Sequence, residues 1–141
     1  MLIAVSRIIV NKPDREQFKE KKLSGTFENL DLSVDELATE VSQGHAFCAQ
    51  HSRKWRKKEN FLQAGFLAVD IDHRLTIPEA LNHPFVQAFG GLIYTSPSHT
   101  EEYHRFRIVF ELEQPITDRQ TMGQAYTGLI LKFGADGACE R

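Results

Sequence analysis

Two aspartates, Asp70 and Asp72, stand two residues apart at the end of the apolar segment 65–71. A short apolar run that follows a glycine predicts a buried strand, and side chains two positions apart on a strand share one face. Neighbouring carboxylates at the end of such a strand repel each other and are costly to desolvate, which a divalent cation between them would relieve. The pair therefore predicts a metal site. The alternative is two solvated aspartates that open a turn.

The segment 105–112 alternates apolar and polar residues with period two, which predicts a strand with one face in the core. Arg105 and Arg107 share the other face of this strand. Their guanidinium groups suit a polyanion such as a phosphate chain. The alternative is that they form ordinary surface pairs with Glu111 or Glu113 on neighbouring strands.

A basic run with one tryptophan precedes the aspartate strand. It consists of Arg53, Lys54, Trp55, Arg56, Lys57 and Lys58. Such a run is usually a solvated surface. It also suits contacts to phosphates, with Trp55 available to stack on a base or a sugar. Its position a few residues before the aspartates favours the nucleic-acid interpretation.

Composition is typical of a globular domain. The chain has 141 residues, 41% of them hydrophobic, and a net charge of −2, which argues against disorder and against a globally basic nucleic-acid binder. No apolar run approaches the length of a membrane span, and the first ten residues lack the features of a signal peptide. Cys48 and Cys139 fit reduced thiols. We therefore expect a cytoplasmic protein with no membrane contact.

The remaining patterns predict an α/β fold of the α+β kind. Capping boxes predict three helix starts, at Ser33 with Glu36, Thr76 with Glu79, and Thr117 with Gln120. A short exposed helix or loop is expected over 15–23. Further strands are expected over 2–10, 46–49 and 91–95, and Pro115 is expected to end the strand that carries the arginines.

In this order the parts resemble the archaeo-eukaryotic primase superfamily, and above all the primase-polymerase domains of plasmids, phages and integrated elements. That family carries an apolar strand with Asp-x-Asp, then a Ser/His motif, then an apolar residue followed by Asp. The resemblance runs from about residue 61 to the C-terminus. The matching residues are Asp70 and Asp72, then Ser98 and His99 leading to Arg105 and Arg107, then Asp136; His104 is a second candidate for the histidine and Glu140 for the last acid.

The resemblance implies a mixed β-sheet with an RRM-like catalytic core and flanking helices. It implies two-metal nucleotidyl transfer, with Mg²⁺ or Mn²⁺ held by Asp70, Asp72 and Asp136. The incoming NTP or dNTP would contact Ser98, His99, Arg105 and Arg107. A single-stranded DNA template would follow the basic run 53–58. The expected role is a DNA primase or primase-polymerase in replication of a plasmid, phage or mobile element.

We expect one catalytic domain over 1–141, with an accessory part over 1–60 and a motif-bearing core over 61–141. The chain is expected to be truncated at its C-terminus, and relatives in this family often carry a helicase domain downstream, which makes a helicase domain or partner an expected companion. The alternatives are a metal-dependent nuclease and a non-catalytic nucleic-acid or nucleotide-binding module with the same fold. The sequence lacks the His-hydrophobe-His motif that usually accompanies the nucleophilic tyrosine of a nicking enzyme.

Overall fold

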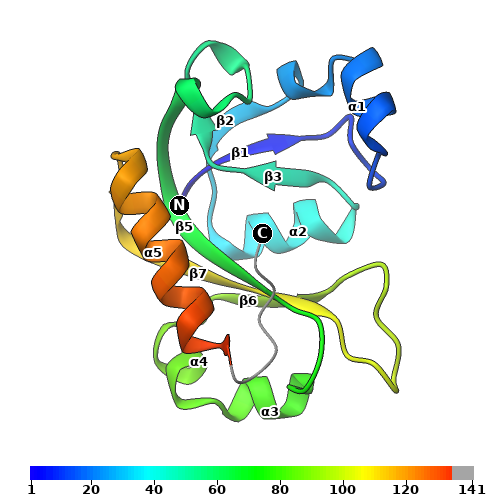
Figure 1. Ribbon diagram of the computed structural model, residues 1–141, viewed down its shortest axis with the longest axis vertical. Helices are drawn as coiled ribbons and strands as arrows, with labels where there is room; N and C mark the ends of the chain where they lie inside the picture. Colours follow the sequence, from blue (N-terminus) through cyan, green and yellow to red (C-terminus); the bar gives the residue numbers. More distant parts are fainter. Residues whose placement is uncertain (135–141) are drawn as a thin grey trace. The chain divides into compact units, whose positions relative to one another are not determined.

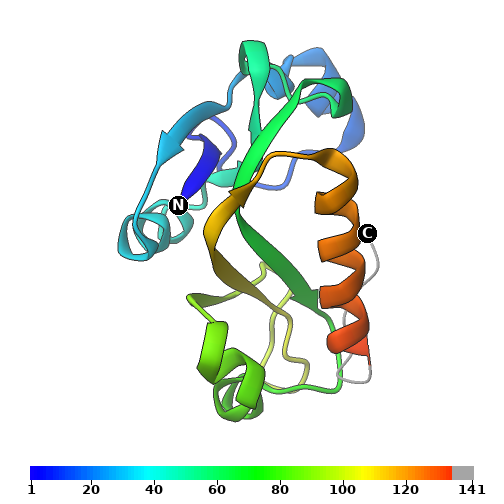
Figure 2. The ribbon, with the colours of Figure 1, turned by 90° about the vertical axis from the view of Figure 1, so that its left-hand side faces the viewer.

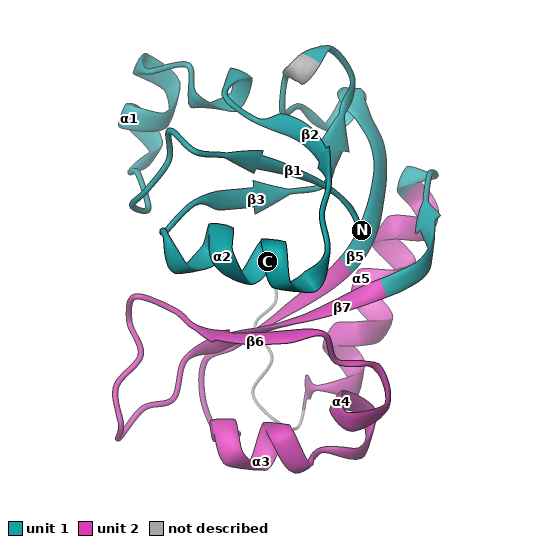
Figure 3. Cartoon of the chain, turned by 180° about the vertical axis from the view of Figure 1, so that it is seen from behind, with its two compact units in different colours: residues 1–66, 112–119 teal, residues 67–111, 120–141 magenta. Residues whose placement is uncertain are grey.

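The computed structural model of the chain describes residues 1–134, apart from the side chain of Lys54. Asp136, Glu140 and Cys139, which the sequence analysis singled out, lie outside the described residues. The chain divides into two compact units (Figure 3). Unit 1 comprises residues 1–66 and 112–119, and unit 2 comprises residues 67–111 and 120–141. Strands and α-helices both occur throughout the described residues, which confirms the α+β class.

Unit 1 contains an antiparallel sheet of three strands in the order β2-β1-β3, with β1 in the centre (Figure 1). The strands are β1 (Leu2–Ser6), β2 (Glu28–Asp31) and β3 (Ala46–Cys48). The helices are α1 (Arg15–Glu20) and α2 (Val34–Ser42). The predicted capping box starts α2, because the Ser33 side chain accepts from the N–H of Glu36 and the Glu36 side chain accepts from the N–H of Ser33.

The first strand is shorter than the sequence predicts, because it ends at Ser6 and not at residue 10. The Ser6 side chain is fully buried, and its hydroxyl accepts a hydrogen bond from the N–H of Ile9 and bonds the Thr26 hydroxyl at 2.6 Å. These polar contacts turn the chain away from the sheet. Burying a hydroxyl is tolerated only when it is paired in this way.

Unit 1 also contains four short segments. They are the 3₁₀ turns η1 (Leu23–Gly25), η2 (Ser52–Lys54) and η3 (Lys58–Asn60) and the strand β4 (Gln50–His51). The Gln50 side chain is buried and donates to the carbonyls of Ile3 and Leu30. One side chain thereby satisfies carbonyls on two neighbouring strands.

Two eleven-residue strands, β5 (Phe61–Ile71) and β7 (Phe106–Ile116), each run through both units. With β4 and β6 (Leu92–Thr95) they form a second sheet in the order β4-β5-β7-β6. Every strand pair whose register is described is antiparallel. The prediction that Pro115 ends the strand was wrong by one residue; its side chain is exposed near the strand end, where a missing N–H is tolerated.

Gly65, in the middle of β5, lies against the backbone of β1. A Cβ atom at this position would collide with the amide nitrogen of Leu2 and would lie 3.2 Å from its Cα and oxygen atoms. Only a residue without a side chain therefore fits here.

The core of unit 2 lies between one face of the sheet and three helices (Figure 2). The helices are α3 (Ile77–Asn82), α4 (Pro84–Phe89) and α5 (Arg119–Lys132). Residues buried in this core are Val69 and Ile71 of β5, Phe106, Ile108 and Phe110 of β7, Ala80, Val86, Leu129 and Phe133. The predicted apolar face of β7 is thus confirmed. Because side chains alternate along a strand, Asp70 and Arg107 project from the opposite face.

The capping box predicted at Thr76 is present at the start of α3. For α5 the start at Arg119 puts Asp118, and not the predicted Thr117, directly before the first helical residue. None of the helices within residues 1–134 is long and apolar enough to cross a membrane.

Candidate functional site

The predicted acid pair lies at the C-terminal end of β5. Asp70 is the penultimate residue of the strand. The strand ends at Ile71, and Asp72 is the first residue after it. Ile71 between them is fully buried in the core of unit 2, so the Asp70 carboxylate lies on the side of the strand away from that core. About a quarter of the Asp70 side chain (27%) remains exposed, which leaves this carboxylate accessible to a ligand.

Asp70 forms a two-point ion pair with Arg107 on β7. The Nη2 atom of Arg107 donates to Oδ2 of Asp70 at 2.9 Å, and its Nε atom donates to Oδ1. Both side chains are mostly buried, since the Arg107 side chain is 26% exposed. Arg107 therefore pairs with the first aspartate of the predicted metal site.

Tyr94 on β6 completes this cluster. It lies directly opposite Arg107 in the antiparallel ladder, and its hydroxyl accepts a hydrogen bond from Nη1 of Arg107 at 3.2 Å. The guanidinium carbon also lies 6.0 Å from the centroid of the Tyr94 ring. The sequence analysis did not single out Tyr94, because its role depends on the register between β6 and β7.

Arg107 is a permanent cation in this setting. Burial acts to lower its pKa, but the hydrogen bond to Asp70 and the negative charges of its neighbours raise the pKa above its usual value. A carboxylate has roughly four lone-pair sites, and Arg107 uses one on each oxygen of Asp70.

The acid pair fits Mg²⁺ or Mn²⁺ in the kind of atom it offers, because both ions prefer hard oxygen ligands. Within residues 1–134, however, no three His, Cys, Asp or Glu side chains are grouped to hold a metal ion. The third predicted ligand, Asp136, lies outside that range. Asp70 and Asp72 are therefore the two candidate metal ligands within the described residues.

Loop 96–105 carries the predicted Ser/His motif between β6 and β7. The N–H of Ser96 donates to the Arg105 carbonyl at 2.9 Å and closes the loop. Nδ1 of His99 accepts from the N–H of Arg105 at 3.2 Å. The side chains of Ser98 and Arg105 are exposed on this loop. The motif thus lies at the end of β6, in the same unit as the acid pair.

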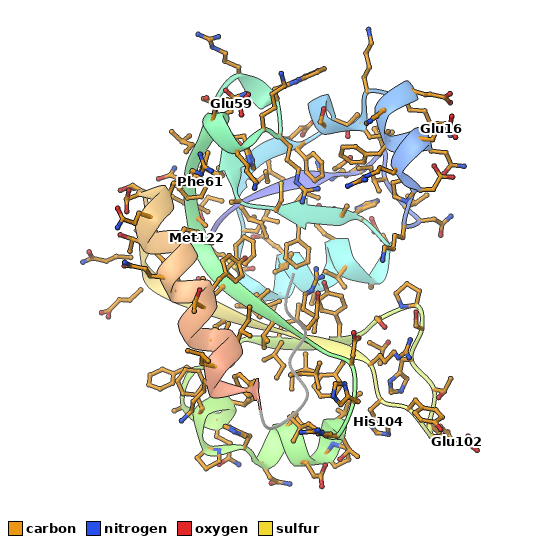
Figure 4. The ribbon with its side chains drawn as sticks, in the orientation of Figure 1. Glu16, Glu59, Phe61, Glu102, His104 and Met122 are labelled. Carbon is orange, nitrogen blue, oxygen red and sulfur yellow. The ribbon has the colours of Figure 1, made fainter. Side chains whose placement is uncertain are left out.

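His104, the second candidate for the family histidine, is attached to α3. Its Nδ1 atom accepts from the N–H of Ile77, the first residue of that helix, at 2.9 Å, and Figure 4 shows it between the loop and α3. The rings of His99 and His104 are 5.0 Å apart in an edge-to-face arrangement. Because both Nδ1 atoms accept backbone hydrogen bonds, each neutral ring carries its proton on Nε2 and can donate it to an anion.

No protein-family model matches this chain, and no curated protein or solved structure is significantly similar to it. The resemblance to primase-polymerases accordingly rests on the order and spacing of motifs in the sequence.

The basic run lies in unit 1, and its side chains separate into two sets. Arg53, Trp55 and Lys57 line an open hollow together with Glu59 and Asn60. The guanidinium of Arg56 instead lies 5.7 Å from the centroid of the Phe27 ring. Trp55 and Lys57 have extended backbones, which send alternate side chains in opposite directions. The basic run was evident in the sequence, but the separation of its side chains into these two sets was not.

Cys48 has the properties of an unreactive thiol. Burial raises its pKa to about 11, although the nearby charge of Arg56 opposes the shift. The thiol is therefore protonated at neutral pH and is a poor nucleophile.

Proposed function

We propose that this chain is a DNA primase or primase-polymerase domain, which performs template-directed nucleotidyl transfer with Mg²⁺ or Mn²⁺ in replication of a plasmid, phage or mobile element. The observation that carries the proposal is the ion pair of Asp70 with Arg107 on the sheet face of unit 2 that points away from its core, with Asp72 two residues further along the chain. Carboxylates beside a permanent cation are the groups that a metal-bound triphosphate requires.

The order of elements in unit 2 supports an RRM-like core. Strand β5 is followed by α3 and α4, then by β6 and β7, then by α5, and the strand order is β5-β7-β6. With α3 and α4 counted as one helical element, these are five of the six elements of the split β-α-β arrangement, in which the third strand lies between the first two. Helices cover one face of such a sheet; on the other face Ala68 and Val109 are buried, and Asp70 and Arg107 remain about a quarter exposed.

The residues have distinct roles under this proposal. Asp70 and Asp72 would hold the metal, with Asp136 as the predicted third ligand. When bound, the ion would activate the attacking hydroxyl and neutralise phosphate charge. Arg107 orients the Asp70 carboxylate through two hydrogen bonds. The Nε2–H of His99 and the exposed guanidinium of Arg105 supply donors for the phosphates of the nucleotide.

Primer synthesis on a single-stranded template with Mn²⁺ and labelled nucleotides tests the proposal. We expect Asp70→Asn and Asp72→Asn to lower the rate by about 100-fold or more, a loss of the size seen when one charge-stabilising group is removed from an active site. Asp35→Asn is the matched control, because Asp35 is an exposed acid of α2 in the other unit. Circular dichroism checks that each variant is folded.

Normal synthesis by both acid-pair variants would overturn the metal-site assignment. Template cleavage without primer products would instead assign the same carboxylates to a nuclease. Binding of nucleic acid with neither reaction, at any metal concentration, would identify a non-catalytic module.

A further inference from the structure

We propose that the hollow around Trp55 binds single-stranded nucleic acid without metal, with one base stacked on the indole ring and the adjoining phosphates paired with Arg53 and Lys57. This assigns the template contact of the proposed function and rests on it for the identity of the strand. The site lies wholly within unit 1.

The hollow has the composition that such a ligand requires. Among the described residues, its lining includes two cations, one indole, one carboxylate and one amide, from Arg53, Lys57, Trp55, Glu59 and Asn60. In the sequence, Arg53 and Lys57 each stand two residues from Trp55, a spacing that matches the alternation of phosphates and bases along a single strand. Extended backbone at Trp55 and Lys57 favours the same direction for these two side chains.

The indole ring is held in place by a glycine in η1. A Cβ atom at Gly25 would lie only 2.5 Å from a ring carbon of Trp55, so the absence of a side chain lets the backbone lie directly against the ring. The N–H of Arg56 donates to the Ser24 carbonyl at 2.9 Å and fixes the chain beside this contact. Trp55 nevertheless stays partly exposed and lines the hollow.

The loop that carries these groups is closed by its own hydrogen bonds. The side-chain amide of Asn60 donates to the Trp55 carbonyl at 3.1 Å, and the N–H of Asn60 donates to the Lys57 carbonyl at 3.0 Å. Arg53 adopts a left-handed backbone with φ of 58°, which is uncommon for a residue with a side chain and is often found at binding sites. A preformed loop loses little entropy when it binds a ligand.

Trp55 is the only tryptophan in the chain, so its fluorescence reports on this hollow alone. We would titrate the full chain with oligothymidylate in the presence of EDTA. We expect saturable quenching, with an affinity that falls as salt rises. Changing both Arg53 and Lys57 to Ala should weaken binding at least about tenfold and reduce the salt slope by about 0.7 for each lost phosphate contact.

Three further variants separate charge from stacking. Lys19→Ala is the control for charge, because Lys19 is exposed on α1, and it should leave the affinity unchanged. Glu59→Gln should tighten binding by a few fold, since it removes the one negative charge of the lining. Trp55→Leu, measured by anisotropy of a labelled oligomer, should lose about tenfold in affinity while keeping the salt slope.

Binding of an abasic oligomer as tightly as oligothymidylate would overturn base stacking, and so would unchanged binding by Trp55→Leu. An absence of quenching, or quenching that the double variant leaves unchanged, would overturn the site. None of these titrations contains metal, so their outcome is separate from that of primer synthesis. Synthesis without quenching would refute only the hollow, and quenching without synthesis would refute only the catalytic assignment.

Discussion

The ion pair between Asp70 and Arg107 joins two residues that the sequence analysis predicted to have separate roles, one as metal ligand and one as nucleotide contact. Both side chains are about three-quarters buried. Removing one partner would leave the other charge poorly solvated, which costs more than the pair contributes by itself. The pair therefore constrains any substitution at the proposed active site.

A double-mutant cycle with Asp70→Asn and Arg107→Gln measures this coupling. We expect each single variant to lower the free energy of unfolding by about 1–3 kcal/mol and the coupling energy to be about 0.5–3 kcal/mol. The measurement is urea unfolding at neutral pH. Arg105→Gln is the control, because its side chain is exposed, and it should change stability by less than about 0.5 kcal/mol. Purely additive single effects would show that the pair contributes nothing specific.

The raised pKa of Arg107 determines how the contribution of this pair to stability changes with pH. Because the pKa of Arg107 is raised, its contribution to stability is complete below its ordinary pKa and would be lost only as pH rose beyond its shifted value. Arg107 therefore stays charged across the accessible alkaline range.

Sequence patterns predicted which face each of these residues occupies but not their pairing. The period-two alternation in each strand was enough to place Asp70 and Arg107 away from the core. Their contact depends on which strands are neighbours in the sheet and on their register, and these are long-range properties. Tyr94 was missed for the same reason.

Among the elements, α3 depends most on local polar contacts. This six-residue helix is too short to be stable by itself, and its start is held by Thr76, Glu79 and His104. The first two lie within the sequence of the helix start, whereas His104 comes from the loop between β6 and β7. The histidine therefore connects the predicted Ser/His motif to a helix that follows the acid pair.

Replacing His104 by Asn, Gln or Ala tests whether a polar atom at the position of Nδ1, and not of Nε2, stabilises the start of α3. Asn places an oxygen near the position of Nδ1 and should keep the bond to Ile77, whereas Gln places its polar group near Nε2 and should lose it. We expect Gln and Ala to lower the free energy of unfolding by about 0.5–1.5 kcal/mol relative to Asn. Chemical denaturation measures this order. Equal stability of the Asn and Ala variants would contradict the capping role.

Local signals predicted some element boundaries but not all, since the capping box at Thr117 and the proline at position 115 did not mark the start of α5 or the end of β7. The capping boxes at Ser33 and Thr76 predicted the starts of α2 and α3, because both partners lie within four residues. The end of β1 was missed, because the hydrogen bond between Ser6 and Thr26 that accompanies it spans twenty residues. Local patterns carry no information on such a contact.

At the scale of the whole chain, the two units are covalently interleaved. Strands β5 and β7 each continue from one unit into the other, and unit 1 is completed only by residues 112–119. If β5 or β7 became disordered in one unit, the segment of the same strand in the other unit would lose the residues that anchor it. We therefore expect the units to unfold in a single cooperative transition.

Paired core variants test this cooperativity. Leu37 in unit 1 and Ile108 in unit 2 are both fully buried, and truncation of each to Ala should cost about 2–5 kcal/mol. Each variant should shift the urea midpoint of Trp55 fluorescence in unit 1 and of the α5 amide NMR signals in unit 2 by the same amount. A variant that moved only the probe of its own unit would show that the units unfold independently.

The contact between Gly65 and the backbone of Leu2 also has a consequence for recognising relatives of this chain. Because any Cβ at this point would collide with β1, a protein that keeps this crossing of strands must keep the glycine, whatever its activity. Gly65 lies five residues before the first aspartate. The search pattern Gly-x₄-Asp-x-Asp therefore combines a steric requirement of one unit with a chemical requirement of the other, and it is more selective than Asp-x-Asp alone.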